Sequence, residues 1–196
     1  MKIQTEEKTR SLSTRVAIFL VLVIINTLLA AFGVITYEVA FGVSGFYIAV
    51  AFMIAFTLWF GGWGAIAAYL GCVIGAGLVG GVPPGLNPFW SLADLWEVLI
   101  PLAAFRAFHA DIGLTTGRDL LVFLGFGWLV NNAVGALWGA SFLAIGGVAP
   151  WDEVPGIFAR WFIVNLVVTI LITPLLLRYV TPWIRKTGIS VNHYWR

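Results

Sequence analysis

The stretch FYIAVAFMIAFTLWFGGWGAIAAYLGCVIGAGLVGG, residues 46–81, decides the fold class. It is apolar almost throughout and lacks the alternation of polar and apolar residues that is typical of a membrane β-barrel strand. About 20 apolar residues in an α-helix cross the roughly 30 Å hydrocarbon core of a bilayer. Because Gly61 and Gly62 divide the stretch, it predicts two successive membrane helices.

The composition of the whole chain supports the same fold class. Of the 196 residues, 61% are hydrophobic and 10% are charged, and the mean hydropathy is +0.98. Soluble domains have about 25% charged residues and about 45–50% apolar residues. The composition therefore excludes a water-soluble globule, and so large an apolar fraction also excludes a disordered chain. We predict an all-α integral membrane protein.

Charged residues and Gly/Pro clusters divide the chain into six candidate spans. They are 16–36, 45–60, 63–82, 89–108, 120–145 and 156–179. We therefore predict a six-transmembrane-helix bundle over residues 16–182, with a basic segment (1–15) before it and a short tail (183–196) after it. The first apolar run is longer than a signal-peptide core, and no small-residue cleavage site follows it, so we expect it to be a retained helix.

The distribution of basic residues predicts an orientation, because cytoplasmic flanks accumulate Lys and Arg. With the N-terminus inside, ten of the 11 basic residues fall on the cytoplasmic side, and Arg160 alone lies outside. The ten are Lys2, Lys8, Arg10, Arg15, Arg106, Arg118, Arg178, Arg185, Lys186 and Arg196. We expect both termini to be cytoplasmic, in a multi-pass protein of the cell membrane.

The three loops predicted on the outer side are rich in Gly, Pro, Trp and acidic residues. They are 37–44, 83–88 and 146–155. Glycine and proline favour tight turns, and the rings of Trp90 and Trp151 suit the membrane–water interface. Two interpretations stay open: the loops are turns with interfacial anchors, or they cover a pocket that opens to the outside.

Polar side chains inside a span are costly and usually face the protein interior or a cavity. This rule, together with the neighbouring Trp90, gives eight candidate ligand-binding residues, which we expect to face one central cavity. They are Asn26, Trp90, Asp94, Glu97, Asn131, Asn132, Arg160 and Asn165. An asparagine can bind a neutral heterocycle or an amide ligand, but it can equally join two helices by a hydrogen bond.

Asp94 and Glu97 are three residues apart and therefore share one face of a helix. Two carboxylates in this arrangement can hold a cation, a protonated ligand or one shared proton. Arg160 is the only basic residue predicted on the outer side. An ion pair from Arg160 to either acid, which would fix the fourth span against the sixth, is the alternative interpretation.

Small residues at intervals of four predict close packing between helices. Ala67, Gly71 and Gly75 form one such repeat in the third span, and Ala51 with Ala55 forms another in the second. These five residues pack either inside the chain or against a separate membrane subunit. For the second case they are the candidate partner-docking residues.

The sequence lacks the motifs of enzymes and of nucleotide-binding or metal-binding proteins. It contains no Gly-x-x-x-x-Gly-Lys loop and no Gly-x-Ser-x-Gly elbow. His109 and His193 fall in a predicted loop and in the tail, and the single Cys72 allows neither a disulfide framework nor a cysteine-based metal site. We expect no enzymatic activity, no cofactor, no bound metal and no nucleic-acid partner.

Six spans in fewer than 200 residues, with the run over residues 46–81 and the ending LIPLAAFRAF (99–108), resemble the substrate-binding S component of energy-coupling factor vitamin transporters. The stretches NNAVGALWGASFLAIGG (131–147) and FARWFIVNLVVTILITPLLLRYVTP (158–182) are similar to the same family. They are also similar to the multi-helix membrane sensor domains that precede bacterial histidine kinases and cyclic-dinucleotide enzymes, where an Asn or Asp precedes a Pro-Leu-Leu ending of the last span.

The S-component resemblance implies a small bundle whose outer loops close over a vitamin or a similar metabolite. It also implies a separate energising module, made of a membrane scaffold and two cytoplasmic ATPases, which drives transport by toppling the bundle. The sensor resemblance implies a membrane domain that signals through a partner chain. We therefore expect a small-solute-binding subunit, and the alternatives are an accessory or scaffolding subunit of a larger membrane complex or a stand-alone sensor domain.

Overall fold

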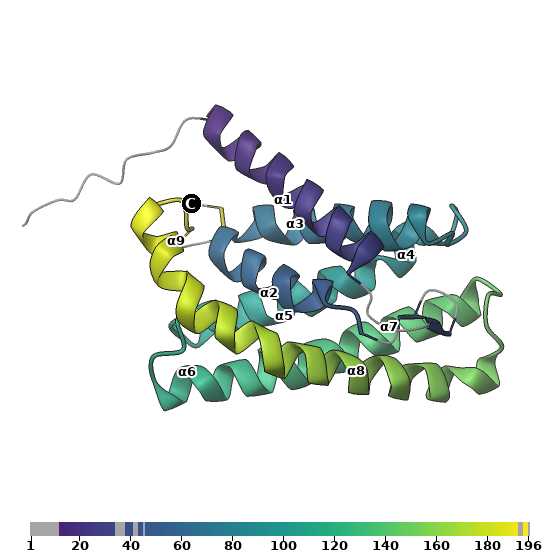
Figure 1. Cartoon of the computed structure of the whole chain (residues 1–196). Coiled ribbons are helices and arrows are strands. Elements are labelled where there is room, and N and C mark those ends of the chain that lie inside the picture. Colours follow the sequence, from purple (N-terminus) through teal and green to yellow (C-terminus); the bar gives the residue numbers. More distant parts are fainter. Residues whose placement is uncertain (1–11, 34–37, 41–42, 45, 192–193, 196) are drawn as a thin grey trace, which may run out of the picture.

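The computed structural model describes residues 12–33, 38–40, 43–44, 46–191 and 194–195. These residues form a bundle of α-helices that α1 crosses obliquely (Figure 1). Within them, five helical stretches are long and apolar enough to cross a membrane: Ser13–Phe32, Gly62–Val79, Asn87–Ala107, Gly117–Ile145 and Trp151–Thr187. The predicted helical bundle of membrane type is confirmed at this level. Most of the predicted basic segment lies outside the described residues.

Helix α1 (Leu12–Phe32) packs against α3 (Gly62–Cys72) and against η1 (Val73–Val79), the π-helical continuation of α3. Gly71 and Gly75 allow this contact. A Cβ atom on Gly71 would collide with Asn26, and one on Gly75 would collide with the Thr27 carbonyl. The rest of α1 is largely exposed apolar surface, which suits a helix that lies against lipid.

Helix α2 (Ala49–Phe60) differs from the predicted second span. Its 12 residues extend about 18 Å, which is less than the thickness of the hydrocarbon core. Ten of the 12 residues are buried, because α1, α3, α5 and α8 surround the helix. The sequence predicted a short second span over residues 45–60, and the helix in this segment is shorter still. Its apolar sequence reflects burial inside the bundle as well as a membrane environment.

The middle of the chain forms two of the long stretches. The first consists of α4 (Asn87–Trp90) and α5 (Leu92–Ala107), and the second of α6 (Gly117–Val122), η2 (Phe123–Val130, π-helical) and α7 (Asn131–Ile145). A capping box fixes the start of α6: the Asp119 amide donates to Thr116 Oγ1, and the Thr116 amide donates to Asp119 Oδ2. This cap places the helix start at Gly117, three residues before the predicted boundary.

The last long stretch runs through four consecutive helical segments. They are η3 (Trp151–Glu153, a 3₁₀ turn), α8 (Val154–Leu175), η4 (Leu176–Val180, π-helical) and α9 (Thr181–Thr187). Pro174 lies inside α8 and has no amide hydrogen to donate. The wider π-helical turn of η4 begins two residues later, so the chain continues as a helix past this missing hydrogen bond.

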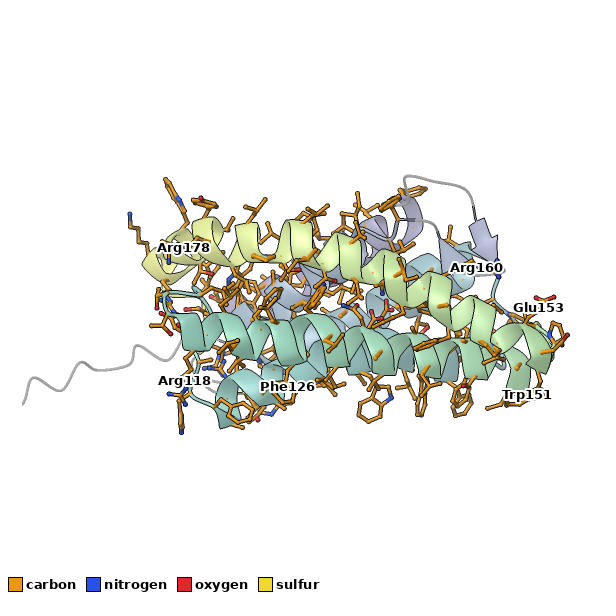
Figure 2. The ribbon with its side chains drawn as sticks, turned by 90° about the horizontal axis from the view of Figure 1, so that it is seen from below. Arg118, Phe126, Trp151, Glu153, Arg160 and Arg178 are labelled. Carbon is orange, nitrogen blue, oxygen red and sulfur yellow. The ribbon has the colours of Figure 1, made fainter. Side chains whose placement is uncertain are left out.

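The two ends of the bundle differ in character. The hairpin of β1 (Glu38–Ala40) and β2 (Val43–Ser44), the η1–α4 loop and the α7–α8 loop lie together at one end, which we call the loop end (Figure 1). The start of α1, the α5–α6 loop and α9 lie at the other, the basic end. Figure 2 shows Arg118 and Arg178 at the basic end and Arg160 with Trp151 at the loop end. The predicted separation of basic residues along the bundle is present in these described parts.

The C-terminal segment packs onto the turn between α2 and α3 at the basic end. The Val191 amide donates to the Trp59 carbonyl (2.8 Å), and the Gly62 amide donates to the Tyr194 carbonyl (2.6 Å). The ring of Trp195 stands perpendicular to that of Trp63, with the centroids 5.7 Å apart. The residues predicted as a free tail therefore include part of the packed structure.

Candidate functional site

Glu97 is the centre of a buried polar cluster between α5, α7 and α8. Its side chain is fully buried. Its Oε1 accepts a hydrogen bond from Nδ2 of Asn165 on α8 (2.9 Å), and its backbone carbonyl accepts one from Nδ2 of Asn131 on α7 (3.1 Å). Gly135 of α7 leaves room for the carboxyl group, because a Cβ atom there would overlap the Glu97 side chain. Three helices thus meet at one acidic residue.

Asp94 lies one helical turn closer to the loop end, on the same side of α5. The Tyr47 hydroxyl, just before α2, donates a 2.9 Å hydrogen bond to its Oδ2. The Cys72 thiol of α3 lies beside Asp94 and the Ser91 hydroxyl. Asp94 is only 2% exposed. The prediction that the two acids share one face of a helix is confirmed, and α3 and the segment before α2 also contribute to their surroundings.

Trp90 and Trp161 pack against each other on the loop-end side of this cluster, with ring centroids 5.8 Å apart. Trp90 is 3% exposed, and its Nε1 has no hydrogen-bond partner within the described part of the chain. Of the two interpretations of Trp90, the interfacial anchor does not fit, because α4 directs its ring inward against Trp161 of α8. Trp151 does lie exposed at the loop end (Figure 2).

Asn132 extends the polar contacts toward the basic end. Its Nδ2 donates to the Trp128 carbonyl (2.6 Å) and to Thr169 Oγ1 on α8 (3.3 Å). On α8 the buried polar residues recur every fourth position, at Asn165, Thr169 and Thr173. Asn132 therefore lies next to the Glu97 cluster along α8, but no hydrogen bond between described residues joins its side chain to Glu97.

The remaining two candidate ligand residues lie elsewhere, so the prediction that all eight face one cavity is wrong. Asn26 is buried between α1 and α3, where its Nδ2 donates to the Leu22 carbonyl of its own helix (2.9 Å). Arg160 is exposed and forms no ion pair with Asp94 or Glu97 among the described residues. The reason is geometric: Trp161 faces inward, and the preceding residue on a helix points about 100° away.

The five candidate docking residues lie inside the chain. Ala51, Ala55 and Ala67 are fully buried, and the Ala51 carbonyl accepts a hydrogen bond from Thr173 of α8. Gly71 and Gly75 face α1 of the same chain. The small-residue repeats therefore serve close packing within the bundle. Of the two interpretations left open, packing inside the chain is the one that the structure supports, because this chain's own helices cover these residues.

The sequence analysis missed several residues of the cluster. Tyr47 and Cys72 come from segments that were assigned to a span without a polar role, and Trp161 and Thr169 were not considered. Helical periodicity could have identified Thr169, because polar residues recur every fourth position at 165, 169 and 173. The contacts of Tyr47 and Cys72 depend on how helices distant in sequence pack, which periodicity does not encode.

The polar side chains of the cluster are mainly carboxyl and amide groups, and no basic side chain enters it among the described residues. Four of its buried polar atoms lack a hydrogen-bond partner there: Trp90 Nε1, Glu97 Oε2, and the Oδ1 atoms of Asn131 and Asn132. Three of the four are oxygens. Buried oxygens of this kind suit a ligand that carries N–H groups, or a cation that prefers oxygen ligands.

Comparisons with protein-family models, with curated proteins and with solved structures gave no match to this chain. The fold and the site therefore define its class by themselves. It is a helical bundle of membrane type with a buried acid–amide cluster between α5, α7 and α8.

Proposed function

We propose that this chain is a membrane-embedded solute-binding subunit, similar in role to the S component of a vitamin transporter. The observation that carries the proposal is the convergence of Trp90, Asp94, Glu97, Asn131 and Asn165 in the interior of the bundle. Ionisable and amide side chains inside a membrane protein are costly and are usually retained for a site or a pathway. The unpaired atoms of the cluster support a ligand in particular, because most buried polar groups in proteins have a partner.

The orientation that we propose follows from the basic end. Cytoplasmic flanks of membrane helices accumulate Lys and Arg, so the basic end faces the cytoplasm and the loop end faces outward. Both termini are then cytoplasmic, and the chain is a multi-pass protein of the cell membrane. A solute from outside reaches the cluster from the loop end, past the Trp90 and Trp161 rings.

The side chains of the cluster favour a small organic solute with N–H donors, such as an amine, an amide or a nitrogen heterocycle. Asp94 supplies carboxyl oxygens as acceptors, Trp90 supplies one unpaired donor, and the indole rings supply flat apolar surface. A separate energising module, with a membrane scaffold and ATPases, is the partner that such a subunit requires.

The proposal is tested by screening the purified chain against metabolites that carry amine, amide or nitrogen-heterocycle groups, with tryptophan fluorescence as the readout. The expected result is saturable quenching by one class of solute. Asp94→Asn is expected to weaken binding about 5- to 150-fold, which corresponds to about 1–3 kcal/mol for one disturbed buried polar contact. Asp152→Asn makes the same chemical change at an exposed loop-end residue and should leave the affinity unchanged.

Co-purification from native membranes distinguishes the alternatives. ATPase subunits together with a scaffold support the transporter role. A histidine kinase or a cyclic-dinucleotide enzyme would instead indicate the sensor, and a stable membrane assembly without solute quenching would indicate an accessory subunit. Either of these two results overturns the proposal.

A further inference from the structure

We propose that the Glu97 cluster also binds a monovalent inorganic cation, with Glu97 Oε2 and Asn131 Oδ1 as protein ligands. This inference rests on the proposed function, to which it adds a bound inorganic ion in the same cluster. The solute is assigned to the Asp94 and Trp90 side of the cluster, and the ion to the side where Glu97 meets α7.

The first observation is that two buried oxygens lie unpaired on neighbouring groups. Glu97 and Asn131 are both fully buried, and neither Glu97 Oε2 nor Asn131 Oδ1 has a hydrogen-bond partner. The 3.1 Å hydrogen bond from Asn131 Nδ2 to the Glu97 carbonyl holds the amide beside the acidic residue. The 2.9 Å bond from Asn165 fixes Oε1, so Oε2 is the carboxyl oxygen that stays available.

The second observation is the lack of a counter-charge in the protein around Glu97. In the part of the chain that the structure describes, the polar groups that face Glu97 and Asp94 are all neutral. They are those of Asn131, Asn165, Trp161, Tyr47 and Cys72. Arg160 is exposed and pairs with neither acid among the described residues, and Arg185 is paired with Asp111 at the basic end. A carboxyl group in a water-poor interior takes up a proton unless a nearby charge compensates it. In this proposal the bound cation supplies that charge to Glu97.

The chemistry of the ligands indicates the kind of cation. Carboxylate and amide oxygens are hard ligands, which suit alkali and alkaline-earth ions rather than transition metals. Among the described residues no three His, Cys, Asp or Glu side chains converge, and divalent sites of the calcium type usually gather several carboxylates. The Glu97 side chain also packs directly onto Gly135, and this close contact favours a bare ion over an organic group at that position.

The test is thermal unfolding of the purified full-length chain without solute. The melting temperature is measured in NaCl, KCl, LiCl, CaCl₂ and MgCl₂ and in N-methylglucamine chloride, all at equal ionic strength. The expected result is a saturable rise in at least one alkali salt, because an ion that binds only the folded state stabilises it. A rise of about 4–10 °C corresponds to an ion concentration roughly 100-fold above its dissociation constant. No difference from N-methylglucamine chloride overturns the inference, and so does stabilisation by CaCl₂ or MgCl₂ alone.

Two matched pairs of variants locate the effect. Glu97→Gln should abolish the salt-specific rise, whereas Glu153→Gln, at an exposed acid of the loop end, should retain it. If Glu97→Gln does not fold, Asn131→Leu should abolish the rise while Asn26→Leu retains it, because Asn26 also has a buried unpaired Oδ1 but packs on α3 instead. An effect that survives in Glu97→Gln or in Asn131→Leu contradicts the assigned ligands.

Solute binding is measured separately by tryptophan fluorescence, so the two failures are distinguishable. A salt-specific rise in melting temperature, together with no fluorescence quenching by any solute, supports the ion site and rules out the proposed function. The opposite result is solute binding that is equal in NaCl and in N-methylglucamine chloride, together with no rise in melting temperature. It rules out the ion site and is compatible with the proposed function.

Discussion

Two helix contacts in the bundle, which we call seams, each bury an asparagine, but the surroundings of the two asparagines differ. Between α1 and α3, Asn26 is buried against Gly71; between α5, α7 and α8, Asn131 is buried where Glu97 packs on Gly135. Both amides donate to a backbone carbonyl, and both keep an unpaired Oδ1. Asn26 bonds within its own helix, whereas Asn131 bonds across to the helix that carries two acids. Because only Asn131 lies beside a carboxyl group on another helix, it is the one of the two asparagines that we assign to the proposed site.

The largest expected effect comes from filling the space that Gly135 leaves for Glu97. Gly135→Val should lower the free energy of unfolding by about 1–3 kcal/mol or more, because its Cβ would overlap the Glu97 side chain and force α5 and α7 apart. Thermal unfolding in detergent measures this change. Gly125→Val is the control, since a Cβ on Gly125 meets no atom within 4 Å. Equal stability of the two variants would show that the seam is not tightly packed.

A second prediction concerns the hydrogen bond between α5 and α8. Asn165→Leu removes the donor to Glu97 Oε1 and leaves a buried carboxyl oxygen without a partner. The expected cost is about 1–3 kcal/mol of unfolding free energy. In a Glu97→Leu background the same substitution should cost much less, so a double-mutant cycle of the four chains measures the coupling. A coupling energy near zero would contradict the bond.

A third prediction sharpens the comparison between the two asparagines. Asn26→Leu should be close to neutral, because the change removes an unpaired oxygen from an apolar seam and Leu22 keeps its helical contacts. Asn131→Leu should cost about 1–2 kcal/mol, since it breaks the bond from α7 to the Glu97 carbonyl. Parallel melting curves give the ranking. The reverse order would mean that the buried amide contributes more to stability between α1 and α3 than between α5 and α7.

The smallest expected effect lies outside the spans, at the 2.5 Å ion pair between Asp111 and Arg185. Burial by itself raises the pKa of Asp111, but the hydrogen bonds from Arg185 and from the Gly113 amide outweigh it and lower the pKa below its ordinary value. A lowered pKa in the folded state stabilises the protein above the unfolded pKa of about 3.9, and the contribution is lost as the pH falls through the folded value. Asp111→Asn should therefore melt slightly below the unmodified chain at pH 7. The gap should close as the pH falls through the folded pKa of Asp111, and a gap that stays constant with pH would exclude the charge as its cause.

The sequence predicted the fold class and the acidic face of α5, because both depend on local patterns. Continuous apolar runs specify helices of membrane type, and a spacing of three places Asp94 and Glu97 on one side of a helix. The length of α2 was not predictable in this way, since burial inside a bundle and burial in lipid select the same residues.

The grouping of the polar residues depended on packing that one sequence does not encode. Asn26 and Asn131 have similar surroundings along the chain, yet only one lies next to Glu97. An ion pair from Arg160 to the acids was the alternative interpretation. Because Trp161 faces inward, Arg160 lies on the outside of α8 and cannot form it. The small-residue repeats predicted close helix contacts, but not that the facing helix is α1 of the same chain.

Mass spectrometry of the intact chain, released from native membranes under conditions that preserve non-covalent complexes, tests the solute-binding role most directly. The account predicts a discrete added mass of a small organic solute on the unmodified chain, reduced in Asp94→Asn and kept in Asp152→Asn. A bare chain mass in all three samples, or an added mass that both variants keep, would contradict it.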